Sequence, residues 1–405
     1  MNNARVLWKL QDPGNPADRT ELHSAIAGAT PRQLFDVPDH VAYLNCASLA
    51  PRLKSVTTAG HAAVEKMASP WRIGSADWFQ ESAQLGQLFA GLIGAPPSSV
   101  TLVPSVSYGI AVAARNIPVN AGDNIVVVAQ EYPSNYYSWR RLSLERGAPI
   151  RTAAVSQGAS ITDAIVSLID GNTAVVAVPN CHWTDGTLID LPRIGAAARE
   201  FDAALVVDAS QSLGAYPIDV AECQPDFLVS VGYKWLLGPY GLGYLYVADR
   251  WHANGIPLEE SWLHRKGSEN FATLVDYTDV YKHGAERFGQ GESPQFYLLP
   301  MAIAALSQVH QWTPAHIQAR LREWTDELSA EARSIGMNCP DPGSRVGHLI
   351  GLKARTGLPA DLAASLAKRD VYVAVRGNSI RVSPHLHSPD TDIKRLVTAL
   401  EELVT

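Results

Sequence analysis

The sequence lacks several features that would point to other classes of protein. Its 405 residues include only four cysteines, and no two of them form a C-x-x-C pair, which argues against a thiolate metal cluster and against a disulfide framework. No segment approaches the roughly 18 consecutive apolar residues that a membrane span needs, and the N-terminal apolar stretch is too short for a signal peptide. We therefore expect a protein of the cytoplasm.

Charge and composition narrow the possibilities further. The formal net charge is −7, and the 33 basic residues form no block, so the basic surface typical of nucleic-acid-binding proteins is not indicated. Apolar residues make up 46% of the chain and charged residues 18%, a composition that excludes overall disorder. We expect a globular protein whose partner is a small molecule, with no nucleic acid and no membrane involved.

Short apolar runs alternate with helical patterns through much of the chain. Because nearly continuous apolar strands separated by helices indicate a parallel sheet covered on both faces, the sequence predicts an α/β fold. Ligands of such sheets bind at the carboxyl ends of the strands, so the residues after each run are the first candidates for a site. The predicted strands are 100–103, 124–128, 174–178, 204–207 and 227–231.

The pattern divides the chain into three parts. Residues 1–40 are polar and interrupted by proline, and we expect them to form an N-terminal arm that packs with a small domain. Residues 41–294 are expected to form the large α/β domain. Residues 295–405 begin with a long helical stretch over about 295–335 and continue with short strands and a terminal helix, which predicts a small α+β domain.

The most informative segment covers residues 205–247. Asp208 directly follows an apolar strand, Gln211 lies three residues later, and Lys234 follows the next strand and precedes the run GPYGLG, which predicts a tight turn and a hairpin. Either charged residue alone is more typical of a helix cap or of a surface lysine. A carboxylate and an amine at the ends of neighbouring strands can, however, face one cleft.

The series V-D-A-x-Q, then D-F, then lysine followed by G-P-x-G-x-G-x-L-Y-V resembles the class V aminotransferase and cysteine desulfurase family of fold-type I pyridoxal 5′-phosphate (PLP) enzymes, which includes kynureninase and isopenicillin N epimerase. The resemblance implies that Lys234 forms a Schiff base with PLP and moves protons at the substrate Cα. It implies that Asp208 keeps the pyridine nitrogen protonated and that Gln211 hydrogen-bonds the phenolic oxygen. The family is dimeric, and Gly291 and Ser293 align with the loop that serves the neighbour's phosphate site.

The resemblance also assigns residues to the cofactor phosphate within one chain. The segment VPSVSY falls where the family places its phosphate loop. Its candidates are Ser105, the backbone N–H of Val106, and Ser107, of which Ser107 is the best aligned. Tyr233 precedes the lysine as a tyrosine does in kynureninase, which makes it a candidate phosphate contact.

Further candidates would contact the cofactor ring. Tyr132 matches the place at which family members present an aromatic or imidazole ring over the cofactor face. In the segment PNCHWTDG, Asn180, His182 and Trp183 compete for a contact near the cofactor oxygen, and we favour the pair His182 and Trp183.

Three residues are candidates for binding the substrate. Arg381, in the segment SIRVS, resembles the family arginine that holds the substrate carboxylate in a bidentate contact. Arg376 precedes it by five residues and is a second candidate. Asn45 matches the N-terminal stretch that lines the substrate pocket.

Two absences refine the expected chemistry. Desulfurases carry a loop cysteine just before the substrate arginine, whereas here RGNS runs into Arg381 without one, which disfavours persulfide-forming desulfuration. No metal site is expected, because the H-x-H of His385 and His387 has no third ligand in matching spacing.

The sequence therefore predicts a PLP-dependent enzyme acting at Cα of an amino acid, either an aminotransferase or an α,β-eliminating lyase of the C–S type. An amino-acid epimerase or racemase and a kynureninase-like hydrolase are alternatives within the family. A noncatalytic PLP-binding regulatory protein is the alternative from another class.

Overall fold

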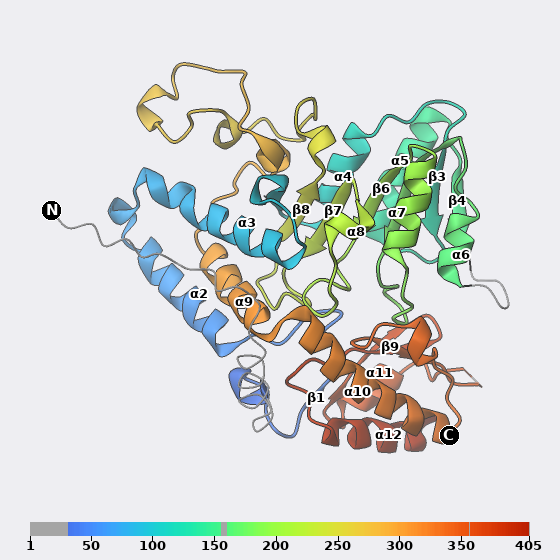
Figure 1. The fold of residues 1–405 in the computed structure, drawn as a ribbon. Coiled ribbons are helices and arrows are strands. Elements are labelled where there is room, and N and C mark those ends of the chain that lie inside the picture. The colour runs from blue at the N-terminus through green and yellow to red at the C-terminus, as the bar shows by residue number, and fades with distance from the viewer. Residues whose placement is uncertain (1–30, 155–159, 356, 405) are drawn as a thin grey trace, which may run out of the picture.

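A seven-stranded sheet forms the centre of the protein in the computed structural model, which describes residues 31–154, 160–355 and 357–404 (Figure 1). Its strands are β2 (Val100–Val103), β3 (Asn124–Val128), β4 (Ile150–Ala153), β5 (Thr173–Pro179), β6 (Ala204–Asp208), β7 (Phe227–Val231) and β8 (Gly243–Val247). Their order is β2-β8-β7-β6-β5-β3-β4; β8 runs antiparallel to both of its neighbours, and the remaining neighbours are parallel. The expected α/β class and the hairpin after Lys234 are confirmed.

Helices cover both faces of this sheet because the side chains along each strand point alternately to the two sides. Val126 of β3 packs into one core, and Val127, the next residue, packs into the other. The first core is closed by α3 (Gln80–Leu92), α6 (Ile161–Val166), α7 (Leu191–Glu200) and α9 (Leu299–Trp312). The second is closed by α4 (Val106–Asn116) and α5 (Pro133–Arg146). Two other helices, α2 (Lys54–Met67) and α8 (Val220–Cys223), pack against α9 and α7 respectively.

The C-terminal elements gather around a smaller sheet, drawn orange to red in Figure 1. Its antiparallel strands are β9 (Ile350–Leu352), β11 (Ala374–Arg376) and β12 (Ser379–Val382), and the helices are α10 (Pro314–Ser334), α11 (Leu362–Ala367) and α12 (Thr391–Val404). Beside it, β1 (Ala42–Tyr43) pairs in parallel with β10 (Val371–Tyr372). Ala42 and Leu44 therefore lie in the core of these C-terminal elements, although the sequence placed them in the large domain.

The helical stretch expected over about 295–335 is confirmed, with one break. It consists of two helices that meet at Thr313, whose φ of 62° is left-handed, and α10 begins with Pro314. Proline is accepted in the first turn of a helix but cannot continue one through its interior. Leu299 and Leu306 of α9 pack into the core of the large sheet, so that core extends beyond residue 294.

The division into three parts stays a prediction. Residues 1–30 of the expected arm lie outside the described residues. Within the described ranges, no helix combines the length and the apolar character that crossing a bilayer requires.

Candidate functional site

Two oppositely charged side chains are buried beyond the ends of neighbouring strands. Asp208 is the last residue of β6 and Lys234 follows β7, and each residue is 5% exposed. Burial lowers the pKa of Lys234 to about 8, and burial raises the pKa of Asp208; the charge of each residue opposes the shift of the other. An amine with a lowered pKa is a better nucleophile at neutral pH. The structure thus brings together the acid and the amine that the sequence singled out.

Aromatic rings flank the Lys234 amine. The Nζ atom lies 5.2 Å from the centre of the Tyr132 ring and 5.8 Å from that of the Tyr233 ring. Tyr132 occupies the N-cap position of α5, where its backbone N–H donates to Glu131 Oε1 at 2.6 Å. Glu131 Oε2 accepts from Asn135 Nδ2 at 3.1 Å, so one buried carboxylate holds the first turn of α5 and the position of Tyr132.

The Gln211 amide has a defined orientation. Its Oε1 accepts from Trp235 Nε1 at 3.0 Å, and its Nε2 donates to the backbone oxygen of Ala47 at 3.0 Å. Because the indole N–H can only donate, it fixes the oxygen end of the amide toward Trp235. The amide nitrogen keeps a second N–H, which makes Gln211 a donor toward any ligand on that side.

The segment after β2 presents hydroxyl groups at a helix N-terminus. Ser105 caps α4: its Oγ accepts from the Tyr108 backbone N–H at 3.2 Å and lies 2.9 Å from Ser107 Oγ. Val106 is the first residue of the helix. Hydroxyl groups and free backbone N–H groups at the start of an eleven-residue helix suit a phosphate.

Two arginines of the C-terminal elements share one hydrogen-bond partner, Ser48. Arg381 of β12 is 2% exposed; it donates from Nη1 to the Trp183 backbone oxygen at 3.0 Å and from Nη2 to Ser48 Oγ at 2.6 Å. Arg376 Nη2 lies 3.4 Å from the same Ser48 Oγ. Both charges lower the pKa of Lys234, so both act on the pocket that holds this amine. Asn45 lies beside the end of β12, because it forms a parallel β-bridge with Ser383. Its Oδ1 is buried and has no hydrogen-bond partner among the described residues.

A family model described as aminotransferase class-V matches residues 52–388. The chain belongs to the class-V aminotransferase family. The family, the PLP-dependent enzyme class and the PLP cofactor expected from the sequence are thereby confirmed.

Similar proteins agree with this family. The uncharacterized aminotransferase YcbU of Bacillus subtilis is 27% identical over 310 residues, which cover 76% of this chain and 80% of that protein. A probable cysteine desulfurase of Methanothermobacter thermautotrophicus is 26% identical, over 78% of this chain and 81% of its own length. The solved apo structure of a cysteine desulfurase from Thermococcus onnurineus covers 92% of this chain and 97% of its own, with 19% identity and a TM-score of 0.80. That likeness confirms the fold-type I architecture.

The three candidates after β5 differ in what they contact. Asn180 Nδ2 donates to the Ile189 backbone oxygen at 3.1 Å. Both ring nitrogens of His182 are engaged, one with Thr184 Oγ1 at 2.8 Å and the other with the Ala129 backbone oxygen at 3.1 Å. Trp183 packs edge to face against Tyr132, with 5.6 Å between the ring centres.

The connection before Arg381 is a tight turn in this member of the class-V aminotransferase family. Arg376 pairs with Ser379, so Gly377 and Asn378 alone form the turn between β11 and β12. Gly377 has a φ of 58°, which glycine adopts without strain. The buried Cys46 and Cys181 offer no substitute thiolate, because burial raises the pKa of both thiols far above neutrality.

Gly291 and Ser293 lie elsewhere in this chain. Gly291 contacts Glu259 and Ser261, and the Ser293 backbone oxygen accepts from Ser82 Oγ at 3.4 Å.

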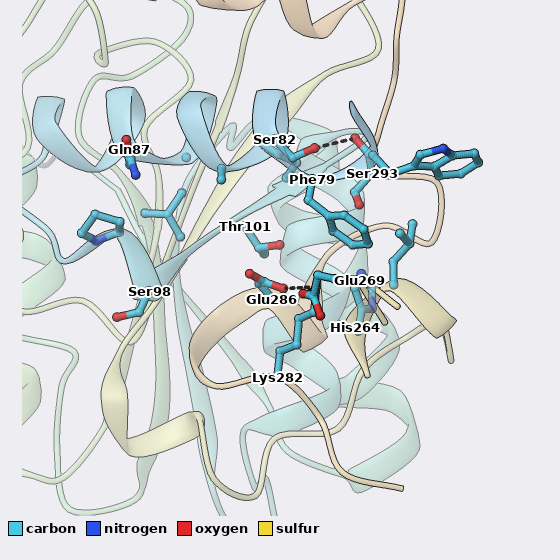
Figure 2. Close-up of a pocket in the computed structure, with 17 residues that line it drawn as sticks. Phe79, Ser82, Gln87, Ser98, Thr101, His264, Glu269, Lys282, Glu286 and Ser293 are labelled. Atoms are coloured by element: carbon cyan, nitrogen blue, oxygen red, sulfur yellow. Dashed lines mark hydrogen bonds and ion pairs between the residues drawn. The ribbon is translucent and has the colours of Figure 1, made fainter. Parts of the chain in front are cut away.

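Ser293 lines a separate cleft of about 370 Å³ (Figure 2) between α3 and the segment that leads to α9. In that cleft Lys282 pairs with two carboxylates of the same chain, Glu269 at 2.8 Å and Glu286 at 3.5 Å. The expected role of the glycine and the serine requires a second subunit and stays a prediction.

Two residues of the pocket were missed from the sequence. Ser48 joins Arg376 and Arg381, and Glu131 fixes Tyr132. Glu131 could have been noticed as an acid placed between a strand and a helix N-terminus. A single serine in the segment YLNCAS carries no comparable signal.

Proposed function

We propose that the chain acts at Cα of an amino acid with PLP attached to Lys234, as an aminotransferase or as an α,β-eliminating lyase of the C–S type. The observation that best supports this function is the buried Lys234 amine, whose pKa falls to about 8 beside the buried Asp208 carboxylate. When bound, PLP supplies an electron sink for the negative charge that develops at Cα.

The residues of the pocket fit this cofactor. Asp208 accepts from the Ser210 backbone N–H at 2.9 Å, and no residue other than Ser210 donates to it among the described residues, so it keeps capacity to accept an N–H from a pyridinium ring. Ser105 and Ser107 would hold the phosphate at the start of α4, and Gln211 would donate its remaining N–H to the phenolic oxygen. Tyr132 would pack against the ring, as its place beside Lys234 Nζ suggests.

The reacting groups of the chain have distinct tasks in this proposal. Arg381 binds the substrate carboxylate through its planar guanidinium group and thereby orients Cα. The Lys234 amine would accept the proton from Cα of the substrate. Burial excludes water from both side chains, which strengthens the electrostatic contacts made to the substrate.

Formation of a persulfide on the enzyme is disfavoured. That reaction needs a thiolate that can reach the substrate sulfur, and the two-residue turn before Ser379 provides neither a cysteine nor a long loop. Cys46 and Cys181 are fully buried and hold their protons. Elimination and transamination require no such group.

We also propose that the enzyme is a homodimer in the cytoplasm. Tyr277 is 97% exposed and Val275 is 79% exposed, on the segment between β8 and α9. Trp262 and Phe271 of the same segment form an aromatic cluster with Trp78. Large exposed apolar side chains next to an aromatic cluster are typical of an interface. Gly291 follows in the same segment, where a partner could use it.

Reduction of the protein with borohydride tests the attachment. The protein incubated with PLP should be yellow, and reduction should remove this absorption and leave the label on the peptide that contains Lys234. Lys234→Ala should be colourless, whereas the exposed Lys54→Ala should bind PLP normally. A colourless wild-type protein, or a label on another lysine, would contradict the proposal.

A panel of amino acids then sorts the reactions. Dependence on added pyruvate indicates transamination, and release of ammonia together with a leaving group indicates elimination. Formation of the opposite enantiomer of the substrate, with solvent deuterium at its Cα, would instead indicate epimerisation and would overturn the proposed reaction classes. Hydrolytic cleavage of kynurenine would do the same.

A further inference from the structure

Two positive charges lie together near the Lys234 amine without a counter-charge among the described residues. Arg376 and Arg381 both donate toward Ser48 Oγ, at 3.4 and 2.6 Å. Their other hydrogen bonds go to backbone oxygens, those of Val375 and Trp183. Neither guanidinium forms an ion pair with a carboxylate in the part of the chain that the structure describes.

This arrangement is unfavourable for the free protein. Like charges held close together repel, and the repulsion grows as water is removed. Arg381 is 2% exposed; burial, and after it the charge of Arg376, lower its pKa to about 10. Elsewhere in the described chain, buried arginine charge is matched: Arg345, which is fully buried, pairs with Asp326.

The two guanidinium groups also have a fixed relation to each other. Ser48 is their common hydrogen-bond partner, and the Trp183 ring lies 5.8 Å from the Arg376 guanidinium and 6.0 Å from that of Arg381. Each guanidinium has five N–H groups and uses only part of them within the chain. Two acceptor groups on one short molecule could therefore be bound side by side.

We propose that the substrate is an amino acid with two anionic groups, its α-carboxylate at Arg381 and a second anionic group on a short side chain at Arg376. This inference rests on the proposed function, because it concerns the substrate of the same site. One carboxylate would neutralise one of the two charges, whereas a carboxylate together with a second carboxylate or a sulfur oxyanion neutralises both. Arg376 then determines specificity, and Arg381 provides the contact that every substrate uses.

Titration of the holoenzyme with matched pairs of amino acids tests this proposal. The pairs are L-aspartate with L-asparagine, L-glutamate with L-glutamine, and L-cysteine sulfinate with L-cysteine, and the readout is the change in cofactor absorption. A charge-assisted contact to Arg376 should make the anionic member of at least one pair bind about 10- to 100-fold more tightly. The pair with the largest ratio distinguishes a carboxylate from a sulfur oxyanion.

Variants assign the preference to its residue. Arg376→Gln should bring that ratio close to one and leave binding of the neutral member unchanged. Arg381→Gln should weaken both members alike. Arg140→Gln, on an exposed position of α5, should change neither.

Calorimetric titration with diacids provides a readout that does not need turnover or an amine. Succinate should bind the protein about tenfold more tightly than butyrate, and Arg376→Gln should abolish the difference. Equal affinities within all pairs, in a protein that is yellow and reacts with amino acids, would overturn this inference alone. A protein that takes up no PLP would overturn the proposed function and this inference with it.

Discussion

Asp208 and Asp226 are two aspartates with the same 5% exposure, and they lie at opposite ends of neighbouring strands. Asp226 precedes β7 and accepts from the Leu205 backbone N–H at 2.9 Å, from Trp251 Nε1 at 2.7 Å and from Arg250. Asp208 ends β6 and accepts from Ser210 alone among the described residues.

The difference shows that burial by itself does not mark a functional acid. A carboxylate whose hydrogen bonds are filled by the chain stabilises the fold. A buried carboxylate that keeps acceptor capacity, and that faces an amine at the carboxyl edge of a parallel sheet, is available to a ligand.

The largest loss of activity is expected when Lys234 is removed. Lys234→Ala removes both the attachment point and the proposed base, so kcat with the best amino acid of the panel should fall by about 10³-fold or more. The stability of the apoprotein should not fall, because a buried amine is unfavourable in its charged form. Steady-state kinetics and thermal unfolding of the apoprotein measure the two effects. Retention of a tenth of the activity would rule out the assigned role.

Replacing each aspartate by asparagine should separate the role of Asp208 in activity from the role of Asp226 in stability. Asp208→Asn should lower kcat by about 10²-fold, because the ring nitrogen loses the charge that favours its protonation. Asp226→Asn should instead lower the free energy of unfolding by about 3 kcal/mol, because Arg250 and the Leu205 N–H lose a buried charged partner. Urea unfolding at equal protein concentration and turnover per folded molecule separate these outcomes. If both variants lose mainly stability, Asp208 is structural too.

The pH dependence of PLP uptake tests the electrostatics of the pair. The Lys234 amine reacts only when unprotonated, and its pKa is lowered from 10.5 to about 8. The rate of PLP uptake by the apoprotein should therefore rise with pH and level off above about 8. Asp208 opposes this shift, so Asp208→Asn should move the midpoint to lower pH while Asp226→Asn leaves it unchanged. Stopped-flow absorbance measures the rate, and a midpoint near 10.5 would contradict the burial argument.

Removal of the indole N–H of Trp235 should give the smallest effect. Trp235→Phe frees Gln211 Oε1, so the amide can turn and present its oxygen to the cofactor. We expect kcat to fall by about two- to tenfold, as for the loss of one hydrogen bond, together with a shifted absorption maximum of bound PLP. Trp324→Phe is the matched control, because Trp324 is equally buried but donates to Pro389, among the C-terminal elements. An unchanged spectrum in both variants would leave Trp235 with a packing role only.

Much of the large sheet could be predicted from the sequence because its strands are continuous apolar runs. The runs at 100–103, 124–128 and 227–231 coincide with β2, β3 and β7. β4 was missed: its residues Ile150–Ala153 are mostly not fully buried, so the run is short and mixed. The break at Pro314 was visible in the sequence, but the helical pattern on both sides of it outweighed the proline.

Only some of the residues around Lys234 could be predicted from the sequence. Periodicity indicates which face of an element is buried, but it does not indicate which distant segments meet there. Ser48 reaches Arg376 across 328 residues, and Gln211 reaches Ala47 across 164. Asp208 and Lys234 were accessible because both follow strands directly, so the topology of the sheet places them together.

The turn at Gly377 and Asn378 limits how this enzyme could change its chemistry. β11 and β12 are paired up to Arg376 and Ser379, so only two residues connect the strands. A cysteine introduced at either turn position would therefore be held at the tip of a hairpin. Acquiring a sulfur-carrying arm would require an insertion of several residues rather than a point substitution.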